Sequence, residues 1–142
     1  MRKGFTLLEL LIVVVILGVL ALIATPAMLN AVDQTKEGAV KANVSTAAST
    51  VTSQFALNTT DDTATIAQNV VDKLNTNNKN PLTGADNPYA TTGTAPGTVV
   101  LTPGTQTDAS TNTTTAIITL VGYGKSGNAI ITKTVAAPAS SN

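Results

Sequence analysis

Glu9 is the residue of this sequence that most clearly requires a partner group. It is the one ionisable side chain in the apolar run from Phe5 to Ala24, where Thr6 is the other polar residue. A carboxylate inside a membrane-spanning helix needs a cationic partner or a proton, and the run contains no Lys, Arg or His. Phe5 stands four residues before Glu9, so we expect the two to share a helix face.

The apolar run itself is long enough to cross a membrane. About 20 apolar residues at a rise of 1.5 Å each span a hydrocarbon core of about 30 Å. Arg2 and Lys3 precede the run, and the next basic residue is Lys36. By the positive-inside rule, the short N-terminus stays in the cytoplasm and the rest of the chain lies outside. The sequence therefore predicts a single-span protein with an outward-facing domain.

Two other interpretations of this segment have to be weighed. A secretory signal peptide has an apolar stretch of about 7 to 15 residues and a small-residue cleavage site, for which Ala24-Thr25-Pro26-Ala27 would serve. The apolar run is longer than such a stretch, and Glu9 interrupts it near its start. A plain membrane anchor explains the length of the run, but it does not explain the order of residues from Lys3 to Glu9.

That order, Lys3-Gly4-Phe5-Thr6-Leu7-Leu8-Glu9, resembles the leader and processing site of type IV prepilins and the related pseudopilins. The family pattern is a short basic leader that ends in Gly, followed by Phe, with Glu on the fifth residue after the cut. The resemblance implies that a membrane peptidase cuts between Gly4 and Phe5 and that the new amine of Phe5 is N-methylated. The Phe5 ammonium that the cut creates could pair with Glu9 within one subunit or between neighbours, and the resemblance implies that it pairs between neighbours.

The resemblance divides the chain into three parts. Residues 1–4 are the cleaved leader, residues 5–29 are the hydrophobic transmembrane and assembly helix, and residues 30–142 are the extracytoplasmic pilin domain. Gly18 and Pro26 weaken the first helix, because Gly costs about 1 kcal/mol relative to Ala and Pro removes a backbone hydrogen bond. We expect a kink near Pro26, and the family implies that the segment between these residues can lose helicity in a filament.

The outer domain is predicted to complete an α+β pilin fold, in which a long N-terminal helix packs on a small antiparallel sheet. The helix continues to about Leu57, and its apolar stripe is formed by Val40, Val44, Ala47, Val51 and Phe55. A short second helix begins at a cap residue, Asp61 or Asp62. Residues 75–97 form a turn-rich loop. Strands at 98–102, 114–121 and 129–135 form a three-stranded antiparallel sheet.

Composition excludes several kinds of active site. The 142 residues include no Cys and no His, so neither a Cys-His nor a Ser-His-Asp site can form, and zinc lacks its usual ligands. The formal net charge is zero and charged residues make up only 11%, which gives no strong nucleic-acid signal. The absence of Cys also departs from the many pilins that close their C-terminal region with a disulfide. We expect a structural protein with no enzymatic activity, cofactor or metal.

Three further motifs have simpler structural explanations. Gly122-x-Gly124-x-x-Gly127 has the form of a dinucleotide-binding fingerprint, but it links two predicted strands and no βαβ unit surrounds it. Triplets that fit the glycosylation sequon begin at Asn43, Asn58 and Asn112, and a chain rich in Thr and Asn makes them by chance. Three side chains offer calcium the oxygen ligands it prefers, but their spacing matches no known motif, which favours polar loop turns: Asp86, Asn87 and Asp108.

The function implied is that of a major pilin, the structural subunit of an extracellular type IV pilus. Its partners would be further copies of the chain, the prepilin peptidase and methylase, the pilus assembly machinery and, before assembly, membrane lipid. The subunit would first be a single-pass protein of the cytoplasmic membrane with its C-terminus outside, and then part of a cell-surface filament. One alternative is the major pseudopilin of a type II secretion or DNA-uptake system. Another is a monomeric, membrane-anchored binding module.

Overall fold

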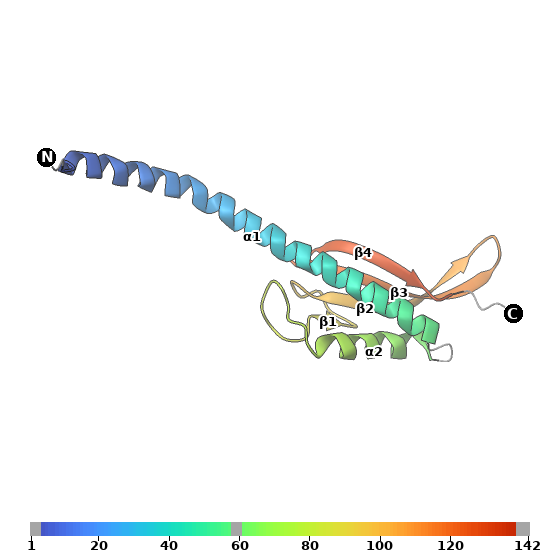
Figure 1. The fold of residues 1–142 in the computed structure, drawn as a ribbon. Helices are drawn as coiled ribbons and strands as arrows, with labels where there is room; N and C mark the ends of the chain where they lie inside the picture. The colour runs from blue at the N-terminus through green and yellow to red at the C-terminus, as the bar shows by residue number, and fades with distance from the viewer. Residues whose placement is uncertain (1–3, 58–60, 139–142) are drawn as a thin grey trace. The chain divides into compact units, whose positions relative to one another are not determined.

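The computed structural model describes residues 4–57 and 61–138. The elements within them are α1 (Leu7–Leu57), α2 (Thr63–Asn75), β1 (Tyr89–Ala90), β2 (Val99–Asp108), β3 (Thr113–Tyr123) and β4 (Ala129–Ala136), shown in Figure 1. The chain divides by its internal contacts into two compact units, residues 1–35 and residues 36–142. The expected fold class, a long N-terminal helix packed on a small and mostly antiparallel sheet, is confirmed.

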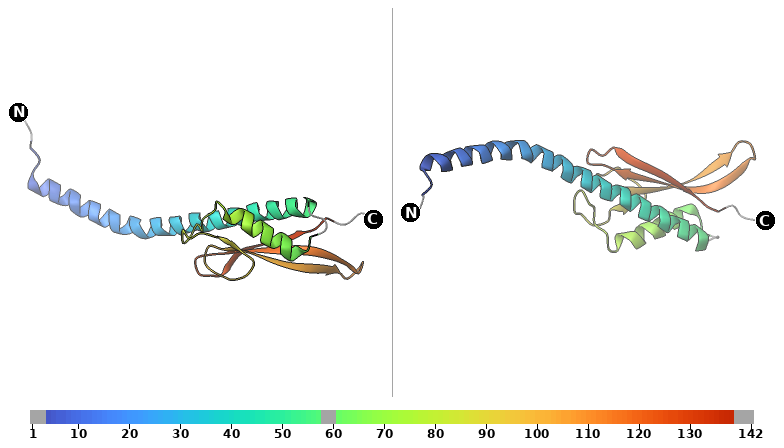
Figure 2. Two further views of the ribbon diagram at one scale, coloured as in Figure 1. Left: turned by 90° about the horizontal axis from the view of Figure 1, so that it is seen from below. Right: turned by 45° about the horizontal axis from the view of Figure 1, so that its top comes forward.

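The hydrophobic core lies in the second unit, between the helices and one face of the sheet. The predicted stripe of α1 is buried there, because its spacing of three and four residues places all its members on one face; it comprises Val40, Val44, Ala47, Val51 and Phe55. In β3, Ile118, Leu120 and Gly122 are buried, and the residues between them are half-exposed. This alternation means that one face of the sheet is covered, and Figure 2 shows both helices on the same side.

The second helix begins where its cap residue was predicted. Asp62 is the N-cap of α2, and its Oδ1 accepts a hydrogen bond from the backbone N–H of Thr65 at 2.7 Å. Hydrogen bonds from the side chain and backbone of Thr65 hold the pKa of Asp62 below its usual value. The helix then presents an apolar stripe to the core, formed by Ile66, Ala67, Val70, Val71 and Leu74.

The sheet corrects the sequence prediction in two places. It has four strands in the order β1-β2-β3-β4, and the additional strand β1 lies in the segment predicted to be a loop and runs parallel to β2. Strand β2 also continues to Asp108, past the predicted end at Thr102. Pro103 does not stop it, because β1 pairs only with Val99 and Val100. Pro103 thus lies on a free edge, where a missing N–H is tolerated.

Gly122 and Gly124 explain the glycine-rich motif through packing. A Cβ atom added to Gly122 would lie 2.9 Å from Cγ2 of both Val44 and Ile131. One added to Gly124 would lie 2.8 Å from Oε1 of Glu37 on α1. These distances are shorter than the normal van der Waals separation of a side-chain carbon from its neighbours. The glycines therefore allow β3 and the turn after it to approach the helix. The motif therefore serves contact between the helix and the sheet.

The loop between α2 and β2 is organised by the side chain of Asn80, which is only 5% exposed. Its Oδ1 accepts hydrogen bonds from the N–H groups of Leu82 at 2.9 Å and Thr83 at 3.1 Å. Its Nδ2 donates to the carbonyl of Pro96 at 2.8 Å. These bonds connect the start of the loop to a point sixteen residues later. One buried amide thus closes the loop in a chain without cysteine.

We expect a chain that begins at residue 30 to be a soluble, folded monomer. All the buried hydrophobic side chains described in the structure come from Val40 or later, whereas the large apolar residues of α1 before Lys36 are exposed. Removing residues 1–29 therefore leaves the core intact and removes the segment that needs lipid or neighbours. Size-exclusion chromatography and circular dichroism test this. A random-coil spectrum would show that the domain folds only on assembly.

Candidate functional site

The start of α1 is fixed by a reciprocal set of hydrogen bonds between Thr6 and Glu9. The backbone N–H and the hydroxyl of Thr6 both donate to Oε2 of Glu9, each at 2.8 Å. The N–H of Glu9 donates to Oγ1 of Thr6 at 3.3 Å. This is a capping box, in which a Thr before the helix and a Glu three residues later satisfy each other's donors.

The capping box refines what the sequence indicated about Glu9. The apolar run offers this carboxylate no cation, but Thr6 gives it two hydrogen-bond donors. Reasoning from the sequence missed Thr6 as a functional residue. The signal was available, because Thr-x-x-Glu immediately before an apolar run is the sequence pattern of a capping box.

The predicted processing site precedes the helix. Gly4 and Phe5 are not helical, and the side chain of Phe5 is 84% exposed. A Cβ atom added to Gly4 would have no neighbour within 4 Å. Because α1 begins at Leu7, Phe5 lies before the first turn and does not share a helix face with Glu9 in the uncut chain. The basic residues of the leader, Arg2 and Lys3, lie outside the described residues.

Gly18 and Pro26 both lie inside α1, which continues through them as one helix. Pro26 provides no N–H for the carbonyl four residues before it. The hydroxyl of Thr25 donates to the carbonyl of Ala21 at 2.8 Å, a side-chain bond of the kind that often bends a helix. The loss of helicity expected between Gly18 and Pro26 stays a prediction.

The first part of α1 exposes apolar side chains all round. Every large apolar residue from Leu7 to Leu29 is exposed. Among the described residues, α1 is long and apolar enough to cross a membrane. Apolar surface as extensive as this is not left in water. It has to be covered by lipid or by other protein chains.

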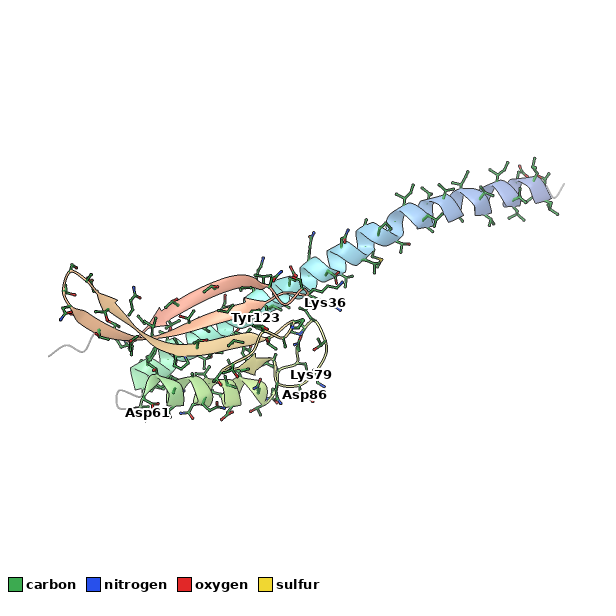
Figure 3. The ribbon with its side chains drawn as sticks, turned by 180° about the vertical axis from the view of Figure 1, so that it is seen from behind. Lys36, Asp61, Lys79, Asp86 and Tyr123 are labelled. Atoms are coloured by element: carbon green, nitrogen blue, oxygen red, sulfur yellow. The ribbon has the colours of Figure 1, made fainter. Side chains whose placement is uncertain are left out.

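The calcium ligands suggested by the sequence do not form one site. Asp86 and Asn87 lie in the loop before β1, and Tyr89 of that strand pairs with Val99, the first residue of β2. Asp108 ends β2, and ten residues of strand extend about 30 Å. Asp86 instead makes an ion pair with Lys79, with 3.4 Å between Oδ1 and Nζ (Figure 3). In the described part of the chain, no cluster of three or more His, Cys, Asp or Glu residues could hold a metal.

The sequons differ in their surroundings. Asn43 lies within α1 beside the buried Val44, whereas Asn112 is exposed in the turn between β2 and β3 with φ of 50°. Asn58 lies outside the described residues.

Comparison with known proteins agrees with this geometry. Residues 1–25 match the family described as the prokaryotic N-terminal methylation motif. The chain is also similar to the type IV narrow pilus major component PilA5 of Thermus thermophilus, with 46% identity over 57 residues that make up 40% of this chain and 46% of the relative. The match thus spans less than half the length of that relative, and no solved structure matches the chain. The chain is thus similar to type IV pilus proteins in its N-terminal part, and its long apolar helix and α+β fold agree with that similarity.

Proposed function

We propose that this chain is the major pilin of an extracellular type IV pilus. The observation that supports this most strongly is the first part of α1, which combines the methylation motif with a long run of apolar side chains that are exposed among the described residues. Lipid covers that surface before assembly, and the same segment of neighbouring subunits covers it afterwards. The role is structural and requires no catalysis by the subunit.

The proposed order of events follows from the charges at the N-terminus. Arg2 and Lys3 hold the leader in the cytoplasm, so the domain that follows the span lies outside. A peptidase then cuts between Gly4 and Phe5, and the amine of Phe5 is methylated but keeps its positive charge. In the fibre this ammonium pairs with Glu9 of a neighbouring subunit, because an unpaired charge in an apolar core is heavily penalised.

The mature chain is expected to begin at a methylated Phe5. Mass spectrometry of the subunit from the cell surface measures this directly. Gly4→Leu should block the cut, because a side chain beside the scissile bond restricts the backbone and crowds the peptidase. Gly38→Leu is the matched control, since Gly38 is also exposed with no neighbour within 4 Å of an added Cβ. A mature N-terminus at Ala27, or an intact Met1 on the surface form, would refute the proposal.

Mechanical shearing of cells distinguishes a pilus from its alternatives. A long pilus comes off as filaments that contain this chain, whereas a short pseudopilus of a secretion or DNA-uptake system stays with the cell. A monomeric binding module would give no crosslinks between copies in the membrane.

A further inference from the structure

We propose that Thr6 is the positioning residue for Glu9 during filament assembly, an inference that rests on the proposed function. The backbone N–H and the hydroxyl of Thr6 both donate to Oε2 of Glu9, each at 2.8 Å. The second carboxylate oxygen, Oε1, accepts no hydrogen bond from the residues that the structure describes. The two oxygens therefore have different roles. Oε2 is held within the subunit, and Oε1 is presented to a partner.

The cut does not disturb this arrangement. Processing changes the nitrogen of Phe5, whereas the bonds to Glu9 use the nitrogen and the hydroxyl of Thr6, which stay as they are. A processed subunit therefore reaches the fibre with its carboxylate already oriented. The group that Oε1 receives is the Phe5 ammonium of another copy, which provides N–H donors and the opposite charge.

Holding Glu9 in place before assembly reduces the conformational entropy that its side chain loses when the ion pair forms. A free Glu side chain populates many rotamers, and freezing them during pairing would weaken the contact. Thr6 freezes the side chain before the partner arrives, so that less freedom is lost at the moment of pairing. The same bonds give Glu9 polar partners in the apolar surroundings of the membrane. Thr6 would then increase assembly through Glu9 alone, with no contact of its own to the neighbour.

The test compares Thr6→Val, which has the same shape but no hydroxyl, with Thr6→Ser, which keeps the donor. The measurement is the amount of sheared filament divided by the amount of cut subunit left in the membrane, so that any change in processing cancels. We expect Thr6→Val to lower this ratio about fivefold, the equivalent of one lost hydrogen bond. Thr6→Ser should restore it.

A double-mutant comparison separates positioning from simple helix capping. In a Glu9→Val background no carboxylate is left for Thr6 to orient, so adding Thr6→Val should cause no further loss of the residual filament. If the full loss appears in both backgrounds, Thr6 acts independently of Glu9 and the inference is wrong. A wild-type ratio for Thr6→Val would also overturn it, and the proposed function would stand. If the unmodified chain yields no filament, the inference and the proposed function are both wrong.

Discussion

Replacing Glu9 with Val should abolish the filament without impairing membrane insertion. The substitution removes a carboxylate from an apolar segment, so the variant should enter the membrane as well as the wild type or better. In the proposed fibre it leaves the Phe5 ammonium of a neighbouring subunit without a counter-charge in an apolar core. We expect sheared filament to decrease about a hundredfold or more, while cut subunit accumulates in the membrane.

Two comparisons make this prediction specific. Glu9→Gln keeps the shape and a hydrogen-bond acceptor but not the charge, so its filament yield should lie between wild type and Glu9→Val. Thr6→Val leaves the charge in place and should have the smaller effect described above. If Glu9→Val gives wild-type amounts of filament with unchanged processing, charge pairing does not guide assembly.

The second large effect is expected from Asn80→Ala, which should destabilise the outer domain by about 3 kcal/mol. The change leaves the N–H groups of Leu82 and Thr83 and the carbonyl of Pro96 without the partner of three part-buried hydrogen bonds. Each unsatisfied buried group costs about 1 to 3 kcal/mol, less where water can reach it. Urea unfolding of the chain that begins at residue 30 measures the loss as a lower midpoint.

Asn77→Ala provides the matched control, because Asn77 lies in the same loop but is exposed. Its free energy of unfolding should change by no more than about 0.5 kcal/mol. Gly97→Ala tests the same contact through the residue that packs against the side chain of Asn80. Gly97 has φ of 78°, and an added Cβ would collide with the side chain of Asn80. Equal stabilities of Asn80→Ala and Asn77→Ala would show that the buried amide does not close this loop.

The N-terminal features could be predicted from the sequence because they depend on contiguous residues. The span follows from the length of an apolar run, and the motif from Gly4, Phe5 and Glu9 at fixed offsets. The buried stripes of α1 and α2 were also predictable, because a helix places residues three and four apart on one face whatever it packs against. The cap at Asp62 was predictable for the same local reason, since its side chain accepts a hydrogen bond from a backbone N–H three residues away.

Tertiary structure decided what depends on residues far apart in the chain. The two-residue strand β1 has no pattern of its own and exists because β2 offers it an edge. The continuation of β2 through Pro103 depends on that position being unpaired on one side. Asn80 resembles any other turn residue in the sequence, and it is buried only because the loop returns to it at Pro96. Local patterns determine which segments are helices, whereas the pairing of strands and the burial of polar side chains depend on contacts that only the folded chain creates.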